Sequence, residues 1–362
     1  MRAIKHTPVF VAAFVLAYAS GPLAALQRPT GPSVGPQSAP LRVVSTLPVY
    51  ASVAKAIGGA EVEVQSIAAP REDAHFVRPK PSFALSIRNA DAFITTGLDL
   101  ELWVPTLLDR AGNSKVSEGG VGYITVYGGV TLLDIPAAID RSAGDVHVFG
   151  NPHLYTDPLR MVQVARNITA GLKRVAPERS ATFEAGLESF IDQIHRRLFG
   201  DGLVDLLGGS TLEQLALAGG LFPFLEENEL EGVPLLDELG GWLRQGQVFR
   251  GEQIICYHKN WVYLEDRFGI QCAEYVEAKP GIAPTPRHVA LLISLMKSES
   301  IRVVLGASYF GADKIQSVAE RGGAQAVVAP MAPGAAPGVD DYFALVDRWI
   351  GDLAAAFGAS DR

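Results

Sequence analysis

The sequence predicts an α/β protein with two parallel-sheet domains joined by a long helix. Apolar strand-like segments alternate with helix-like segments twice, first between residues 41 and 126 and again between residues 253 and 357. A helical stretch separates the two series, and 362 residues are enough for two domains. Alternation of this kind is typical of parallel strands connected by crossover helices.

The first series opens with the apolar run LRVVST, which is typical of a buried strand. The helix after it is expected to end at Gly58-Gly59, because glycine breaks the helical pattern. The expected strands are 41–46, 62–67, 92–95 and 123–126, and the expected helices are 51–57, 82–89 and 100–110.

The second series repeats the same alternation after residue 250. Its expected strands are 253–257, 271–276, 301–305 and 326–328, and its expected helices are 261–268, 287–297, 313–322 and 340–357.

A helical stretch lies between the two series. Apolar residues keep helical spacing through residues 161–175, Pro177 interrupts them, and the spacing resumes over 178–198. A helix over 178–198 would be about 30 Å long, which is enough to bridge two small domains. His195 on this helix is flanked by Arg196 and Arg197, so we expect it on a solvated face.

The N-terminus has the pattern of a secretory signal peptide. Arg2 and Lys5 precede an apolar run that is too short to span a bilayer, and Leu23-Ala24-Ala25 resembles a cleavage site. We expect cleavage near Ala25 and export of the mature chain. The expected organisation is a signal peptide (1–25), a flexible leader (26–40), an N-terminal α/β domain (41–158), a helical linker (159–198) and a C-terminal α/β domain (199–362) with a helical insertion at about 199–250.

Composition limits the partners and the redox state. Lys plus Arg (31) against Asp plus Glu (39) gives a net charge of −8, which excludes nucleic acid as a bulk partner. Cys256 and Cys272 are the only cysteines, and an exported chain favours a disulfide between them. The alternative is a pair of buried free thiols.

Three histidines follow strands or precede the helical stretch. His75 comes after the second strand, His153 lies between the first series and the helices, and His258 directly follows the strand 253–257. In open parallel sheets the ligand crevice lies outside the carboxyl ends of the strands, where these side chains could converge. Their spacing matches no local metal motif, so a structural role for each histidine stays open.

The segments around these histidines resemble a known family. LRVVSTLPVYASVAKAIGG, EDAHFVRPKPS, NPHLYTDP, YHKNWVYLEDRFGI and VEAKPGIAPTPRH follow one another in the order typical of zinc-type periplasmic solute-binding proteins of ABC transporters, a group that includes manganese binders. The resemblance implies that His75, His153 and His258 bind one zinc ion between two α/β domains. It also implies a periplasmic protein that delivers zinc to a membrane permease.

Two departures from the family pattern concern the remaining ligands. The family often supplies a carboxylate near the last strand, but residues 328–332 contain none. The fourth position is therefore open to water, Glu72, Asp73, Asp313 or another group. Many relatives carry a His-rich loop before the second ligand, whereas this chain has only His147 there. His147 is either an accessory ligand or, as we expect, a surface residue.

Three functional classes are open: a zinc transport receptor, an exported zinc hydrolase and a metal-independent structural domain. Three histidines and an open position also describe catalytic zinc. The chain has no HExxH motif, so we expect no enzyme. The receptor hypothesis also accounts for the export signal and the two halves.

Zinc is expected rather than manganese, at one ion per chain. Imidazole suits zinc and copper, whereas manganese prefers carboxylate oxygen and water. The resemblance implies that manganese-handling relatives have a carboxylate where this chain has His258. The other expected partners are the permease and an exported protein that donates the metal, and we expect a monomer.

Overall fold

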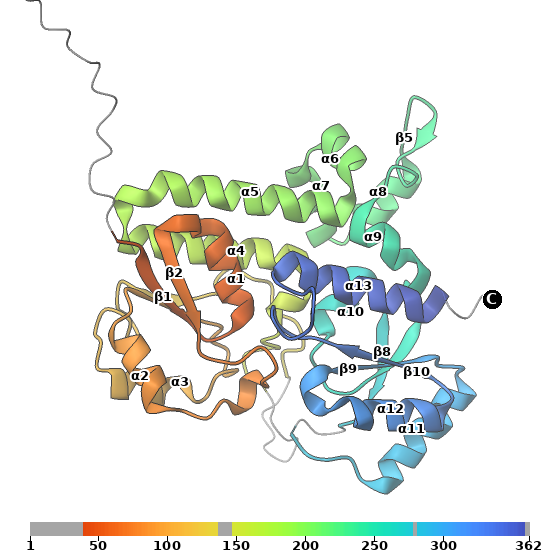
Figure 1. The fold of residues 1–362 in the computed structure, drawn as a ribbon. Helices are drawn as coiled ribbons and strands as arrows, with labels where there is room; N and C mark the ends of the chain where they lie inside the picture. The colour runs from red at the N-terminus through yellow and green to blue at the C-terminus, as the bar shows by residue number, and fades with distance from the viewer. Residues whose placement is uncertain (1–38, 137–146, 278–280, 359–362) are drawn as a thin grey trace, which may run out of the picture. The chain divides into compact units, whose positions relative to one another are not determined.

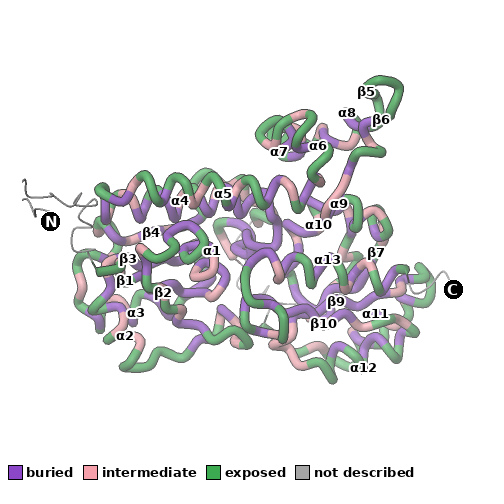
Figure 2. The backbone as a smooth tube through the Cα atoms, turned by 45° about the horizontal axis from the view of Figure 1, so that its top comes forward, coloured by how far each residue is buried: buried purple, intermediate pink, exposed green. Residues whose placement is uncertain are grey.

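The computed structural model describes residues 39–136, 147–277 and 281–358, whose fold is shown in Figures 1 and 2. The expected signal peptide, nearly all of the expected leader and the residues just before His147 lie outside these ranges. In the part of the chain that is described, no helix is long and apolar enough to cross a membrane.

Two sheets of four parallel strands form the framework, as predicted (Figure 1). Their strand orders are β2-β1-β3-β4 and β10-β9-β7-β8, so both sheets have the same topology with the first strand of each series inside. The strand order therefore reverses beside β1 and beside β7, and a ligand crevice is expected at the carboxyl ends there. The strands are β1 (Leu41–Ser45), β2 (Val62–Ser66), β3 (Ala92–Thr95), β4 (Tyr123–Thr125), β7 (Gln253–Cys256), β8 (Gln271–Tyr275), β9 (Val303–Ala307) and β10 (Gln325–Ala329).

Helices follow the strands at nearly the expected positions. Proline stands in the first turn of α1, α2, α3, α4 and α11, where its missing N–H costs no helical hydrogen bond. The helices that connect strands are α1 (Pro48–Gly58), α2 (Pro81–Arg88), α3 (Val104–Ala111), α10 (Val262–Phe268), α11 (Pro286–Ser298) and α12 (Ala312–Gly322), and α13 (Tyr342–Gly358) follows the last strand.

Two long helices, α4 (Pro158–Val175) and α5 (Ser180–Phe199), lie side by side between the two series (Figures 1 and 2). The short 3₁₀ turn Pro177–Arg179 separates them, at the proline that interrupts the helical pattern. α1 and α4 contact the first sheet, and both also contact α5. The 20 residues of α5 agree with the helix expected over 178–198.

His195 is buried on α5, so the expectation of a solvated face is wrong. Only 4% of His195 is exposed, and its Nε2 lies 2.8 Å from a carboxylate oxygen of Glu213 on α7 (Gly209–Leu217). A Cβ atom on Gly209 would lie 2.2 Å from the Nδ1 of His195, so α7 can cover the ring only with glycine there. The flanking arginines gave no signal of this cover, because it comes from another helix.

Residues 199–250 are mainly helical, as expected, but they also contain a small antiparallel hairpin that the sequence did not predict. Its two strands are exposed (Figure 2). The elements here are α6 (Asp201–Leu207), α7, α8 (Leu221–Glu227), β5 (Glu229–Leu230), β6 (Val233–Pro234) and α9 (Gly241–Gln245).

The expected disulfide between Cys256 in β7 and Cys272 in β8 is present, with Cα atoms 5.4 Å apart. It links neighbouring strands of the second sheet, two residues before His258. The alternative of two free thiols is therefore wrong.

Asp157 binds two arginines beneath the connection between the halves. Its fully buried carboxylate caps α4 at the N–H of Leu159 and accepts hydrogen bonds from Arg160 at 2.6 Å and from Arg267 of α10 at 2.9 and 3.0 Å. Burial alone would raise the pKa of Asp157, but the positive charge and hydrogen bonds of Arg267, helped by Arg160, lower it overall. This carboxylate therefore holds α10 of the second half against the start of α4.

Replacing this carboxylate is expected to destabilise the fold. Asp157→Ala leaves Arg267 buried without its partner and should lower the free energy of unfolding by about 3–5 kcal/mol. The matched control is Asp352→Ala, which breaks an exposed pair with Arg348 and should cost less than about 1 kcal/mol. Urea denaturation of the ion-free protein measures both values, and equal losses would contradict the role given to Asp157.

Candidate metal centre

The structure brings His75, His153 and His258 together from three separate segments. His75 lies in the 3₁₀ turn Ala74–Phe76 after β2, His153 precedes the 3₁₀ turn Leu154–Thr156, and His258 follows β7. The ring centroid of His75 is 5.3 Å from that of His153 and 5.8 Å from that of His258. The centroids of His153 and His258 are 6.2 Å apart.

All three imidazoles are held in the same way, through Nδ1. The Nδ1 atom of His75 lies 2.7 Å from Asp73, that of His153 lies 2.9 Å from Asn151, and that of His258 lies 3.1 Å from Glu277, with a side-chain oxygen as partner each time. An oxygen acceptor at Nδ1 keeps the proton there and leaves the Nε2 lone pair for a metal ion. Such partners are typical of metal-binding histidines.

Two of these partners belong to a local turn that the sequence analysis missed. Asp73 and Asn151 each precede a histidine by two residues, and each also accepts the backbone N–H of that histidine at 3.0 Å. Asp and Asn side chains favour this kind of turn. The repeated pattern Asp-x-His and Asn-x-His was therefore a readable signal, whereas Glu277 is 19 residues from His258 and gave none.

His147 joins the cluster, so the expectation of a surface residue is wrong. Its ring stacks on that of His75 at 5.2 Å between centroids, and the two Nε2 atoms are 3.2 Å apart. Its ring centroid also lies 5.9 Å from that of His153. The contact with His75 joins residues 72 positions apart, which no local pattern indicates.

The electrostatics of the cluster favour neutral imidazoles. Burial lowers the pKa of His153 well below its usual value, and the neighbouring histidines His75, His147 and His258 lower it further. Burial, followed by the charges of His75 and His258, lowers the pKa of His147 to about 3. Neutral imidazole is the form that binds a metal ion.

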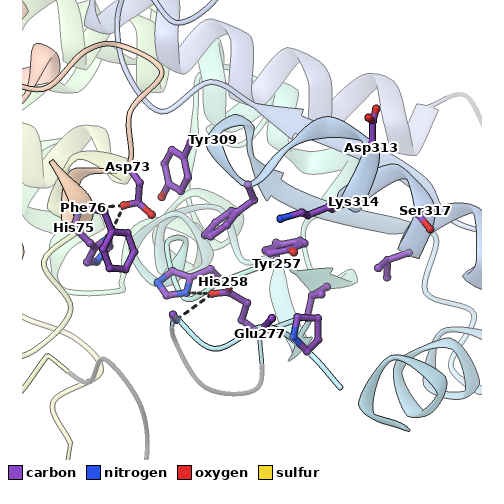
Figure 3. Close-up of a pocket in the computed structure, with 16 residues that line it drawn as sticks. Asp73, His75, Phe76, Tyr257, His258, Glu277, Tyr309, Asp313, Lys314 and Ser317 are labelled. Atoms are coloured by element: carbon purple, nitrogen blue, oxygen red, sulfur yellow. Dashed lines mark hydrogen bonds and ion pairs between the residues drawn. The ribbon is translucent and has the colours of Figure 1, made fainter. Parts of the chain in front are cut away.

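The three carboxylates considered for a fourth ligand lie in different places. Asp73 bonds His75 from behind; burial alone would raise its pKa, but the hydrogen bonds and charge of His75 lower it overall. Glu72 accepts the backbone N–H of Ala69 at 3.1 Å. Asp313 lies on α12, and Figure 3 shows its carboxylate directed away from the histidines. Asp73 also lines the cavity beside His75 and His258.

A cavity of about 700 Å³ adjoins the cluster and is lined at one end by His75 and His258 (Figure 3). Tyr257 and Phe310 line it as well, stacked with 4.6 Å between ring centroids. Its lining includes Phe76, whose side chain is 61% exposed, so the cavity reaches the surface. Since a water molecule occupies about 30 Å³, a hydrated cation has room to reach the histidines.

The cluster does not have the closed geometry of a bound metal. Within residues 39–136, 147–277 and 281–358, no three His, Cys, Asp or Glu side chains are already arranged to hold an ion. Asn260 also faces one of the rings, because its amide nitrogen lies 3.1 Å from the Nε2 of His153. Asn260 is fully buried and was not singled out from the sequence.

Paired sheets of equal topology, with histidines from both halves converging on one site, define a two-lobed α/β binding protein. The chain belongs to the ZnuA family, described as zinc-uptake complex component A periplasmic, whose model matches residues 43–197 and 231–356. Residues 198–230, which contain α6, α7 and α8, lie outside the match.

Relatives with named metals share part of the sequence. The zinc-binding lipoprotein AdcA of Streptococcus pneumoniae serotype 4 is 25% identical over 173 residues, covering 45% of this chain and 33% of AdcA. The iron ABC transporter substrate-binding lipoprotein MtsA of Streptococcus pyogenes serotype M1 is 24% identical over 160 residues, covering 43% of this chain and 48% of MtsA. The chain thus matches between a third and a half of these relatives' own length.

Solved structures share the fold. A crystal structure of ZnuA matches with a TM-score of 0.64 and 18% identity, covering 88% of this chain and 99% of that one. A Mn-bound periplasmic metal binding protein from Candidatus Liberibacter asiaticus matches with a TM-score of 0.60 and 16% identity, covering 87% of this chain and 98% of that one. At these identities the likeness shows the common architecture.

The buried His153 makes the stability of the ion-free protein depend on pH. The pKa of His153 is lower in the folded protein than in the unfolded chain. Below pH ~6.5 the unfolded chain therefore binds more protons than the folded protein. The free energy of unfolding is thus unaffected by His153 above that pH and falls as the pH drops below it. His153→Gln should therefore flatten the fall of the unfolding free energy between pH 7 and 5, by up to about 1.4 kcal/mol per pH unit.

Urea denaturation in the presence of a chelator gives these slopes. Asn167→Gln, which removes no titratable group, is the control and should keep the wild-type slope. The same slope in wild type and His153→Gln would contradict the argument.

Proposed function

We propose that this protein is an exported receptor that captures zinc with high affinity in the periplasm and delivers it to the membrane permease of an ABC transporter. Membership of the ZnuA family supports the transport role. The observation that carries the proposal is that three histidines from separate segments each have Nδ1 held by an oxygen acceptor, which keeps the proton at Nδ1 and makes Nε2 the atom that would bind the ion.

His75, His153 and His258 are the proposed ligands of one zinc ion, which is the cargo of the protein. Nitrogen ligands suit zinc better than manganese, which prefers oxygen. The two carboxylates behind the rings, Asp73 and Glu277, add negative charge that balances a divalent cation. Since named relatives include both the zinc-binding AdcA and the iron transporter component MtsA, zinc is a proposal from the donor set.

His147 is the proposed fourth ligand, in place of water or of the three carboxylates. Two nitrogens bound tetrahedrally to zinc at about 2.0–2.1 Å are separated by about 3.3 Å. The 3.2 Å between the Nε2 atoms of His147 and His75 is close to that value. The lowered pKa of His147 also keeps it unprotonated at neutral pH.

The location and partners follow from the same proposal. The signal-like segment 1–25, cleaved near Ala25, would export the chain, and the proposed partners are the permease and an exported metal donor. We propose that the protein acts as a monomer without nucleic acid. We also propose an N-terminal domain (41–158) and a C-terminal domain (199–362). The linker between them (159–198), which contains α4 and most of α5, would be stiff.

An exported zinc hydrolase, the second function considered, is not supported. The chain lacks an HExxH motif, and the carboxylates of Asp73 and Glu277 each bond the Nδ1 of a histidine through one oxygen. A hydrolase would need a free general base beside the metal.

Loss of one proposed ligand should abolish tight zinc binding. His258→Ala is expected to weaken zinc binding by about 100-fold or more, because loss of an outer-shell partner alone costs 10–100-fold. His288→Ala, a histidine on α11 whose ring bonds the carbonyl of Tyr275, is the matched control and should bind zinc like wild type. Calorimetry with zinc and with manganese measures these affinities, and manganese binding as tight as zinc would contradict the metal assignment.

The role of His147 has its own test. His147→Ala should weaken zinc binding by at least about tenfold while the other three histidines still hold the ion. X-ray absorption at the zinc edge should show the outer-shell scattering of four imidazole rings in wild type and of three in His147→Ala. Unchanged affinity and an unchanged spectrum would remove His147 from the ligand set.

A further inference from the structure

Asn260 lies where the metal-binding nitrogen of His153 points. Its side chain is fully buried, and its Nδ2 lies 3.1 Å from the Nε2 of His153 and 2.9 Å from the hydroxyl oxygen of Tyr309. Its carbonyl oxygen Oδ1 is buried and, within the part of the chain described, has no hydrogen-bond partner. The Nδ2 group of Asn260 thus has hydrogen-bond partners, whereas its Oδ1 has none among the described residues.

The orientation of the Asn260 amide follows from a chain of hydrogen bonds that starts at Asn151. Asn151 accepts the backbone N–H of His153 through Oδ1 at 3.0 Å and donates through Nδ2 to the carbonyl of Lys259 at 2.8 Å, which fixes its amide. The Nδ1 of His153, 2.9 Å from that same Oδ1, must therefore carry a proton. In a neutral imidazole the other nitrogen is then an acceptor, so the atom of Asn260 that faces it must be the NH₂ group.

This hydrogen bond uses the lone pair that a metal ion requires. Neutral imidazole has one such lone pair, at Nε2 when Nδ1 is protonated. The amide N–H and the ion therefore compete for one atom. The unpartnered Oδ1 is consistent with an amide that is held in place by His153 and Tyr309 rather than by its own full set of hydrogen bonds.

We propose that Asn260 is a positioning residue that limits zinc affinity and promotes release. In the ion-free protein it donates to the Nε2 of His153, and it must withdraw when zinc binds. As the ion leaves, the amide returns to the lone pair and stabilises the empty site. This inference rests on the zinc-binding function proposed above. In a carrier, a competing donor inside the site would speed the release of the ion.

Removing the donor should tighten binding. Asn260→Leu preserves the size of the side chain but cannot donate, so zinc affinity should rise roughly threefold to tenfold, with slower dissociation, as expected for the loss of one competing hydrogen bond. Asn167→Leu is the matched control: its amide donates to the carbonyls of Val126 and Gly128, both at 2.7 Å, and its zinc affinity should stay at the wild-type value.

Competition with a fluorescent chelator and stopped-flow release of zinc measure these changes in the full mature chain. Wild-type protein that binds zinc, together with Asn260→Leu that binds equally or more weakly, overturns this inference alone. Wild-type protein that binds no zinc overturns the proposed function instead.

A spectroscopic measurement does not depend on how the variant folds. Long-range ¹H–¹⁵N correlation of the ion-free wild-type protein should show His153 protonated at Nδ1, with the Nε2 resonance shifted as for a hydrogen-bond acceptor. His153→Gln assigns the signals. A ring protonated at Nε2 overturns the inference, because Asn260 would then have no lone pair to occupy.

Discussion

The buried carboxylate of Asp157 is the constraint on which the site depends. It caps α4 and binds Arg267 of α10, so the connecting helices and the second half are fixed to each other at this point. His153 lies four residues earlier, and Thr156 between them donates to its carbonyl at 3.0 Å. The backbone that carries His153 is therefore tied to the second half through charged groups that could not be left buried alone.

Side-chain oxygens around the histidine cluster orient its rings. Each ring is oriented by an oxygen at Nδ1, and two of these oxygens also bind the backbone N–H of the histidine that they orient. This arrangement sets the tautomer and the direction of each ring, which in the proposed zinc site would reduce the cost of ordering the ligands. Asp73, one of the groups open for the fourth ligand position, bonds the Nδ1 of His75 in this arrangement.

The cluster combines rings of fixed orientation with a hydrogen-bond donor, Asn260, and a cavity that leaves it open on one side. Asn260 faces His153, and the cavity beside His75 and His258 reaches the surface past Phe76. Tight capture and timely release make opposite demands on a carrier, because every contact that stabilises the bound ion also slows its departure. In the proposed carrier, the buried amide of Asn260 would favour the empty site, and the cavity would give the ion a path to the histidines.

The sequence by itself determined the eight parallel strands, the long helix, the disulfide and the three histidines at strand and segment ends, because periodicity and strand–helix alternation are local properties. The Asp-x-His and Asn-x-His turns were also local and could have been read. Tertiary structure alone decided that His147 joins the cluster, that His195 is covered by α7, and that Asn260 faces His153. Those contacts join residues 14 or more positions apart, and their geometry depends on how the helices and the two sheets pack, which no short window of sequence contains.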